Sequence, residues 1–300
     1  MRPLRIAILW HQHQPYYKSE TDFILPWVRL HGIKDYYDLA ELLHSFPRVK
    51  QTFNVVPAMI AQIDEYTTGI ADDTVRRLAR IEAEKLTDAD KSAILQRFFI
   101  ANEENMIHPY PRYNELKTAA SAAGFDLRSF TAQDWRDLQV WYSLAWIGPL
   151  SRRRPELNRF FEKGSGFSET EKQILFENED EILSGIVPLM KRLAQLGQAE
   201  ISVSPYYHPI LPLLIDTETA REAMPGLRLR SCLFARPEDA QEQIGRAAAL
   251  YGSKFGSAPA GMWPSEGSVS DAALAMIARN GFKWVATDEE ILFGSSAEGM

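Results

Sequence analysis

The chain has 300 residues, of which 45% are hydrophobic and 24% are charged, a composition that suits a soluble globular protein with a large core. Acidic residues outnumber basic residues by 40 to 33, so no nucleic-acid partner is expected, because nucleic-acid-binding proteins usually display basic clusters. The single cysteine, Cys232, excludes an internal disulfide framework.

The first elements predict alternating strands and helices. Residues 4–10 (LRIAILW) form a short continuous apolar run, typical of a strand buried on both faces. The run is too short for a secretion signal or a membrane span, so we expect a cytoplasmic protein with no membrane partner. A helix over 34–46, a strand over 49–56 and a helix over 58–66 follow. This alternation predicts a parallel sheet or barrel.

The pattern then changes to helices with few strand signals between them. We expect a helical insertion over 72–196 within one barrel domain that spans 1–300. Such an insertion either shapes a substrate cleft or is purely structural, and the sequence leaves both open. The expected helices are 72–85, 88–104, 132–148 and 169–196.

Alternation of strands and helices returns after this region. A helix is expected to start at Pro237, Glu238 and Asp239, and another to run over 271–280 between a Ser270 cap and Gly281. The remaining strands are expected at 199–204, 258–263 and 283–287. About five strands are fewer than a closed barrel uses. Either further strands lie in the irregular stretches, or the chain is a fragment of a longer protein.

Two histidines follow the first strand, at His11 and His13. Residues two apart in an extended segment point to the same side, so both imidazoles are expected to face one cavity. A neutral imidazole offers one donor and one acceptor, which suits sugar hydroxyls and a metal equally well. Trp10 and Tyr16 supply flat faces for a sugar ring.

A proline-rich loop, PYYHPILP, follows the strand at 199–204. Proline restricts its own φ and the residue before it, so this loop is expected to hold Tyr206 and His208 rigidly. Glu200, within the preceding strand, is interpreted as a supporting or substrate-binding residue. A packing role for His208 stays open.

Two segments with carboxylates end consecutive strands, GMWPSEGSVS with Glu266 and WVATDEE with Asp288. Cleavage of a glycosidic bond needs two carboxyl groups, about 5 Å apart when configuration is retained. Strand ends at one mouth of a barrel would bring Glu266 and Asp288 together. The local chemistry alone does not choose among Asp288, Glu289 and Glu290.

Five motifs, in this order, resemble the successive sequence regions of glycoside hydrolase family 57. This family comprises retaining enzymes acting on α-glucans and includes α-amylases, amylopullulanases and 4-α-glucanotransferases. The resemblance runs from about residue 6 to residue 292. The motifs are HQHQPYY, TFNVVP, AEISVSPYYHPILP, GMWPSEGSVS and WVATDEE.

The resemblance implies an α/β fold, an incomplete (β/α)7 barrel followed by a C-terminal helical bundle that would lie beyond Met300. It implies Glu266 as the nucleophile and Asp288 as the general acid/base. The substrate contacts that it implies fall on His11, His13, Glu200, His208 and Trp263. No cofactor and no metal are expected.

The implied activity is double-displacement cleavage of α-1,4 bonds in an α-glucan polysaccharide or oligosaccharide. Cleavage of α-1,6 bonds and glucan transfer remain open, as does the oligomeric state, although HQHQPYY favours the amylase and amylopullulanase side. One rival is a metal-dependent barrel hydrolase using His11, His13, His208 and Asp288. Another is a glucan-binding protein without catalysis.

Overall fold

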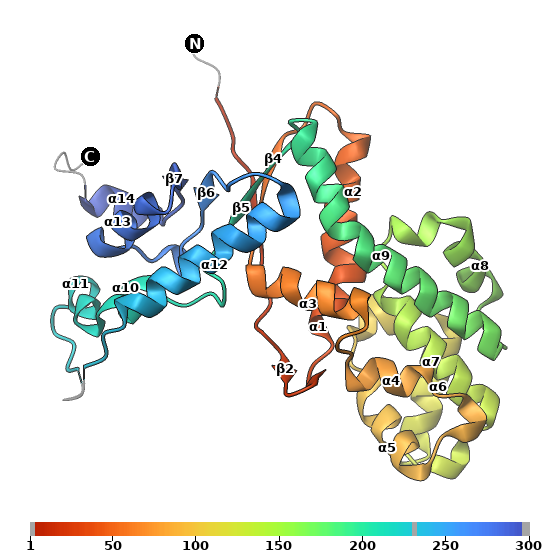
Figure 1. Ribbon diagram of the computed structural model, residues 1–300. Helices are drawn as coiled ribbons and strands as arrows, with labels where there is room; N and C mark the ends of the chain where they lie inside the picture. The colour runs from red at the N-terminus through yellow and green to blue at the C-terminus, as the bar shows by residue number, and fades with distance from the viewer. Residues whose placement is uncertain (1–3, 230–232, 296–300) are drawn as a thin grey trace. The chain divides into compact units, whose positions relative to one another are not determined.

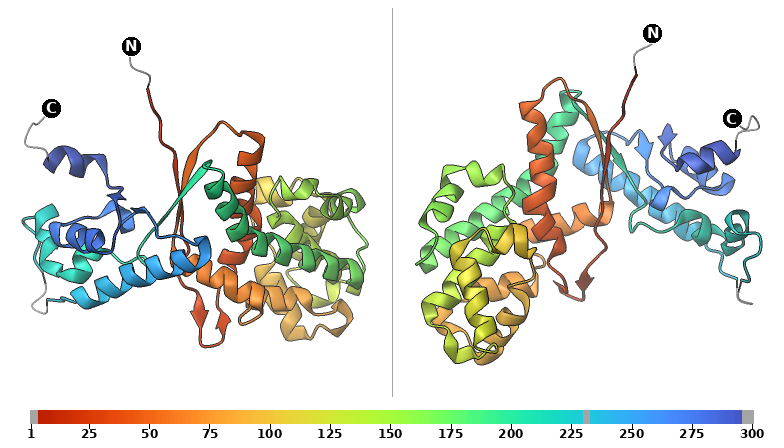
Figure 2. Two further views of the ribbon diagram at one scale, coloured as in Figure 1. Left: turned by 45° about the horizontal axis from the view of Figure 1, so that its top comes forward. Right: turned by 180° about the vertical axis from the view of Figure 1, so that it is seen from behind.

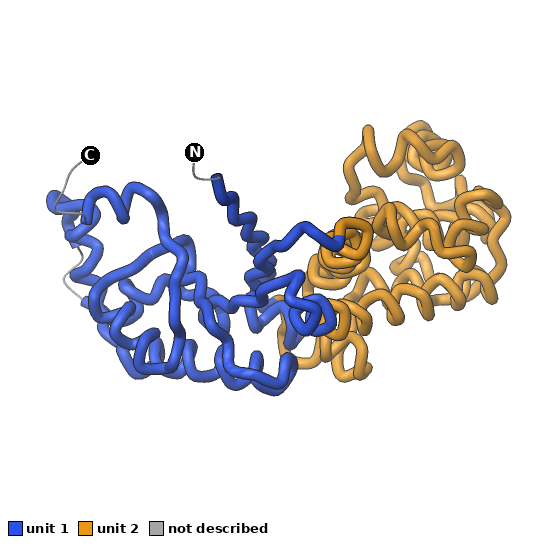
Figure 3. The backbone as a smooth tube through the Cα atoms, turned by 90° about the horizontal axis from the view of Figure 1, so that it is seen from above, with its two compact units in different colours: residues 1–16, 47–61, 190–300 blue, residues 17–46, 62–189 orange. Residues whose placement is uncertain are grey.

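The computed structural model describes residues 4–229 and 233–295, which form two compact units, each discontinuous in the sequence (Figure 3). The sheet unit comprises Met1–Tyr16, Pro47–Ala61 and Met190–Met300, and the helical unit comprises Tyr17–Phe46 and Gln62–Leu189. Cys232 lies outside the described residues.

Five parallel strands form the sheet of the sheet unit, in the order β1-β4-β5-β6-β7. The strands are β1 (Leu9–Gln12), β4 (Gln51–Val55), β5 (Ala199–Val203), β6 (Gly261–Met262) and β7 (Trp284–Val285). β1 and β4 run side by side in both views of Figure 2, with His11 opposite Asn54. The predicted α/β class with a parallel sheet is confirmed.

The first strand differs from its prediction. Leu9–Gln12 forms β1, whereas residues 4–8 belong to no strand. Leu4 is 86% exposed, so this apolar run is not buried on both faces. The reason is its position: β1 is the outer strand of the described sheet, and its apolar neighbours lack a covering layer there.

Helices of the sheet unit join and flank these strands, and α12 contacts both β5 and α10 (Figure 1). The start of α12 at Pro237 and the capping of α13 by Ser270, which accepts a hydrogen bond from the Ala273 amide, confirm two predictions. The elements are α10 (Leu211–Ile215), η7 (Thr217–Thr219), α11 (Ala220–Ala223), α12 (Pro237–Phe255), η8 (Ser265–Gly267), α13 (Asp271–Arg279) and α14 (Glu289–Ser295). Two helices pass from one unit into the other, α3 (Pro57–Thr68) and α9 (Glu169–Gln195).

The helical unit contains one short antiparallel hairpin, β2 (Lys18–Ser19) with β3 (Asp22–Phe23). Thr87 and Thr131 form capping boxes with Asp90 and Asp134, which fixes two helix starts. Its helical elements are α1 (Trp27–His31), η1 (Gly32–Tyr36), α2 (Tyr37–Glu41), η2 (Leu42–Ser45), α4 (Thr74–Arg80), η3 (Ala83–Lys85), α5 (Asp88–Arg97), η4 (Glu103–Ile107), α6 (Pro111–Ala122), η5 (Leu127–Ser129), α7 (Ala132–Trp146), η6 (Ser151–Arg153) and α8 (Pro155–Lys163).

These helices agree with the expected sites of α4, α5, α7 and α9, whereas α6 and α8 were not predicted. Both begin with a proline at the first helical turn, Pro111 and Pro155, which is a recognised start signal. In the described part of the chain, every helix is too short or too polar to cross a bilayer.

A buried ion network lies within the helical unit. Arg29 donates to Asp73 at 2.8 Å and to Glu179 at 3.3 Å, and the three side chains are at most 1% exposed. Burial alone would raise the pKa of Asp73, but the charge and hydrogen bonds of Arg29 overcome it and lower that pKa. Burial raises the pKa of Glu179 despite the attraction of Arg29. The guanidinium therefore compensates two desolvated carboxylates.

Arg29→Met is expected to lower the free energy of unfolding by about 3–5 kcal/mol, because it leaves buried charge without a partner. Urea titration measures this change. Arg77→Met is the matched control: the Arg77–Asp22 pair is largely exposed, so its loss is expected to cost at most about 1 kcal/mol. Equal stability losses in the two variants would contradict this account of the network.

Candidate active site

Four predicted side chains meet at the carboxyl edge of the sheet. His11 lies in β1, His13 follows β1, His208 follows β5 and Trp263 follows β6. The His11 ring centroid lies 5.7 Å from that of His13, 5.0 Å from that of His208 and 6.0 Å from that of Trp263. The His13 and His208 rings stack at 4.1 Å. Parallel strands place their following loops at one edge, where α/β proteins bind ligands.

A buried polar row beneath this cluster was missed by the sequence analysis. His11 Nδ1 lies 2.6 Å from Asn54 Oδ1, and Asn54 Nδ2 donates to Ser202 Oγ at 3.1 Å. Ser204 Oγ donates to the same Asn54 oxygen at 3.0 Å. Because this oxygen is an acceptor, His11 carries its proton on Nδ1 and presents a lone pair on Nε2. A polar Asn54 inside the apolar segment TFNVVP was the available signal.

His208 is largely buried although it lies in a loop. Its side chain is only 4% exposed, and its backbone adopts a left-handed φ of 60°. Burial, followed by the nearby imidazoles of His13 and His11, lowers the pKa of His208 to about 4. Burial and His11 lower the pKa of His13 too, although Glu266 opposes the shift. Both rings are therefore favoured in the neutral form, which can donate and accept hydrogen bonds.

The depressed pKa of His208 predicts a pH-dependent stability. The unfolded chain takes up a proton near 6.5, whereas the folded chain resists protonation down to about 4, so stability falls as the pH falls through this window. After allowance for solvent screening, the free energy of unfolding of the wild type is expected to fall by about 1 kcal/mol more than that of the His208→Asn variant between about pH 7 and about pH 5. Urea unfolding at both pH values measures it, and Asn tolerates the left-handed φ. Identical losses of unfolding free energy in the wild type and the variant would contradict the attribution of this pH dependence to His208.

Glu266 lies in the tight turn η8, between Ser265 and Gly267. Its backbone φ is 54°, and its side chain is 74% exposed. Glu266 and His208 are two of only four non-glycine residues with positive φ in 4–229 and 233–295. Such conformations cost about 1–3 kcal/mol and concentrate at functional sites. The turn therefore presents an accessible carboxylate, whose Oε1 lies 4.0 Å from His208 Nδ1.

The two carboxylate segments lie side by side. Thr287 Oγ1 donates to the Gly267 carbonyl at 2.6 Å. A Cβ on Gly267, which has a φ of 68°, would come within 3.3 Å of the Asp288 amide nitrogen. The exposed Asp288 carboxylate accepts a hydrogen bond from the Glu290 amide at 2.8 Å. Glycine at 267 therefore permits a close approach that a side chain would obstruct.

The tyrosines of the loop after β5 have different surroundings. Arg246, from α12, lies over the Tyr206 ring with its guanidinium carbon 4.1 Å from the centroid. Tyr207 is 43% exposed and makes an edge contact with Tyr16 at 5.6 Å. Gln243 accepts hydrogen bonds from both tyrosine amides. Helix α12 therefore anchors the loop, and Tyr207 is the more accessible ring.

Two predicted substrate-binding residues lie apart from the histidine cluster. Trp10 alternates with His11 along β1, and its indole N–H donates to Gln51 at 2.8 Å. Glu200 lies at the amino end of β5 and accepts a hydrogen bond from the Trp284 indole at 2.9 Å. The contact suits the supporting role that was one interpretation of Glu200. Substrate binding by Trp10 and Glu200 stays a prediction.

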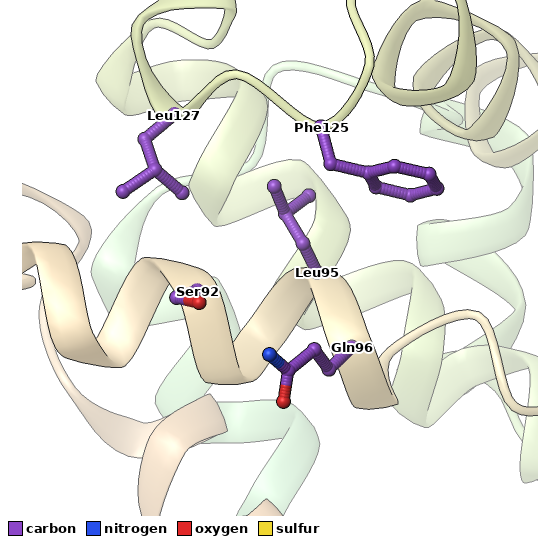
Figure 4. Close-up of a pocket in the computed structure, with 5 residues that line it drawn as sticks. All are labelled: Ser92, Leu95, Gln96, Phe125 and Leu127. Carbon is purple, nitrogen blue, oxygen red and sulfur yellow. The ribbon is translucent and has the colours of Figure 1, made fainter.

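The helical unit has a separate hollow between α5 and the turn that precedes η5 (Figure 4). Figure 4 shows the apolar side chains of Leu95, Phe125 and Leu127 at this hollow, and the amide of Gln96 and the hydroxyl of Ser92 complete the lining. None of these five residues carries a carboxylate or an imidazole. The chemical groups expected for bond cleavage are those at the sheet edge.

Comparison with known proteins gives a family match over nearly the whole chain. The family model described as glycosyl hydrolase family 57 matches residues 7–298. No curated protein sequence gave a significant match.

Solved structures that are similar to the chain include three over 93% of its length. They are the α-amylase AmyC from Thermotoga maritima, with 15% identity and a TM-score of 0.45, a GH57 branching enzyme from Thermococcus kodakaraensis, with 16% and 0.43, and a GH57-type branching enzyme from Pyrococcus horikoshii, with 16% and 0.46. The chain covers 38%, 38% and 40% of these structures, respectively.

Proposed function

Because the chain belongs to glycosyl hydrolase family 57, we propose that it carries the reacting carboxylates of an enzyme that cleaves α-glucosidic bonds with retention of configuration. The hydrogen bond from Thr287 Oγ1 to the Gly267 carbonyl is the main support for this proposal. It joins the turn of Glu266 to the segment of Asp288, next to the histidine cluster. Two carboxyl groups at one substrate are what the reaction needs.

In the proposed mechanism, Asp288 protonates the leaving glycosidic oxygen while Glu266 attacks the anomeric carbon. The glycosidic bond breaks and a β-linked glycosyl-enzyme forms. Asp288, now ionised, removes a proton from water or from a sugar hydroxyl, whose oxygen then displaces Glu266. Water gives hydrolysis, and a sugar hydroxyl gives glucan transfer.

The surrounding residues are proposed to bind the sugar. The imidazoles of His11, His13 and His208 offer hydrogen-bonding groups for hydroxyls, and Trp263, stacked near His11, offers an apolar ring face. Tyr206, held by Arg246, is proposed to support the loop as well as to contact substrate. We also infer that the five strands belong to the incomplete (β/α)7 barrel, with a helical insertion over 72–196 and a bundle further along the full-length protein.

Exposed Tyr207 is proposed as a platform for a glucose unit. Tyr207→Ala is expected to raise KM for a malto-oligosaccharide by about 5-fold to 10-fold with little change in kcat, because stacking contributes about 1 kcal/mol to binding. Tyr207→Phe keeps the ring and is expected to keep KM. Steady-state kinetics measures both values. Equal effects of the two substitutions would assign the loss to the hydroxyl and contradict stacking.

Product analysis with the full-length protein tests the proposed function. Starch, pullulan and malto-oligosaccharides are incubated with it, and the products are separated while proton NMR follows their anomeric form. Shortened α-glucans or redistributed chain lengths, with α-anomers formed first, are expected. Initial β-anomers, or unchanged glucans, would overturn the proposal. Hydrolysis of α-1,4 bonds, debranching at α-1,6 bonds, disproportionation and branching give different product sets, so the same assay determines the reaction.

A further inference from the structure

Three imidazoles of the sheet unit offer nitrogen atoms that lie within 4.8 Å of one another, from His11, His13 and His208. We propose that this cluster binds one divalent transition-metal ion, with Zn²⁺ as the probe, and that the bound ion excludes the glucan. Metal binding stands on the cluster itself. The exclusion of glucan rests on the proposed function, which places sugar hydroxyls at the same nitrogens.

His11 is prepared for coordination by the residues behind it. Its Nδ1 donates to Asn54 Oδ1 at 2.6 Å, so the Nε2 lone pair is available. Ser202 and Ser204 hold the Asn54 amide in this orientation. In metal sites a coordinating histidine almost always donates its other ring N–H to a fixed acceptor. Buried Asn54 supplies this outer contact.

His208 provides a second and independent indication of a ligand. Its side chain is 4% exposed, and no hydrogen-bond partner for Nε2 lies among residues 4–229 and 233–295. A buried polar atom without a partner costs about 1–3 kcal/mol. An ion or a water molecule is a common explanation for such an atom in a native protein.

The distances require only local adjustment. Zinc–nitrogen bonds of about 2.0–2.1 Å in a tetrahedral site place two ligand nitrogens about 3.4 Å apart. The widest pair therefore has to close by at most about 1.4 Å. The stacked rings of His13 and His208 have to turn toward the ion, and both residues lie outside the strands. Three protein ligands leave a fourth position for exchangeable water.

The ligand set differs from that of the metallohydrolase rival. Among the described residues, the group whose ligand atoms lie within 4.8 Å of one another contains three histidines and not Asp288. Glu266 Oε1, 4.0 Å from His208 Nδ1, is placed to orient that ring from outside. The ion would occupy the nitrogen lone pairs that accept sugar hydroxyls, so it acts as a competitor of the substrate and not as part of bond cleavage.

Calorimetric titration of the metal-free, full-length protein with Zn²⁺ tests the site. The wild type is expected to bind one Zn²⁺ ion with micromolar affinity or tighter. His13→Ala and His208→Asn are expected to lose this binding, whereas His44→Ala, on the helical unit, is expected to retain it. Co²⁺ replaces Zn²⁺ for an absorption spectrum, whose intense visible bands report four-coordinate geometry without any variant. Absence of Zn²⁺ binding at the folded wild-type protein, or binding that survives both substitutions, would overturn the metal site.

Kinetics with a malto-oligosaccharide tests exclusion of the glucan. Zn²⁺ is expected to raise KM with kcat unchanged, and glucan is expected to weaken Zn²⁺ binding in turn, because linkage between two ligands is reciprocal. Zn²⁺ that binds through the histidines and leaves KM unchanged overturns exclusion. Calorimetry needs no turnover: an inactive protein that still binds Zn²⁺ through these residues refutes the proposed function and leaves the metal site standing.

Discussion

Glu266→Gln is expected to lower kcat/KM for a malto-oligosaccharide by at least about 10⁴-fold, because an amide cannot form the glycosyl-enzyme and loss of a nucleophile has effects of this order. Binding of the glucan, measured by calorimetry, is expected to change little, since glutamine keeps the size of the side chain and one acceptor oxygen. The turn is also expected to be preserved, because glutamine has the same backbone preferences as glutamate and meets the same φ of 54° at position 266.

A second substitution at the same position separates the reaction from folding. Glu266→Gly removes the carboxylate and relieves the left-handed strain, so it is expected to be inactive yet more stable by about 1 kcal/mol. With azide and an α-glucosyl fluoride, this variant is expected to form the β-glucosyl azide by a single displacement. Near-normal turnover by either variant would remove Glu266 from the mechanism.

Asp288→Asn is expected to lower kcat for an unactivated glucan by about 10²-fold to 10⁴-fold, the usual contribution of general acid/base catalysis. Formation of the glycosyl-enzyme from a substrate with an excellent leaving group is expected to be affected far less, because that oxygen or fluoride needs no proton. Added azide is expected to give the α-glucosyl azide, through two displacements. The opposite anomers distinguish the roles of Asp288 and Glu266.

Two neighbouring acids provide matched controls for Asp288. Glu289→Gln and Glu290→Gln alter the same exposed segment and are expected to keep kcat within about 3-fold of the wild type, as groups outside the reaction. Asparagine at 288 still accepts the hydrogen bond from the Glu290 amide that begins α14, so the helix start is retained. Full activity of Asp288→Asn on unactivated glucan would assign the acid to another residue of the full-length protein.

The parallel sheet was predictable because its strands have local signatures. β4 and β5 are short segments that are followed within two residues by a proline, and both lie inside their predicted ranges. The extent of β1 was not predictable, because burial of residues 4–8 depends on which elements cover the outer strand. Helices with strong end signals, such as α12, were predicted closely, whereas the π-helical turn η1, which overlaps the start of 34–46, has no simple periodic pattern.

The sequence predicted which motifs contribute residues to the candidate site, but not the contacts among those residues. Strand ends identified His11, His208 and Glu266, because parallel strands bring their following loops to one edge. The contacts that orient these residues depend on strand register: Asn54 lies opposite both His11 and Ser202. The register between strands that are far apart in the sequence cannot be predicted from either segment alone.

Contacts between loops are equally hidden from the sequence. The Thr287 hydroxyl and the Gly267 carbonyl are joined although they lie twenty positions apart, and the Arg246 contact with Tyr206 comes from a helix after the loop. Proximity in sequence does not place side chains together either: Trp10 lies on the other side of an alternating strand from its neighbour His11 and pairs with Gln51.

Trapping the covalent intermediate tests the central claim most directly. A 5-fluoro-α-glucosyl fluoride, which slows breakdown of the glycosyl-enzyme, is incubated with the full-length protein, and the digest is analysed by mass spectrometry. A fluoroglucosyl adduct on Glu266 is the predicted result. An adduct on a different carboxylate, or turnover with inversion and no adduct, would contradict the account.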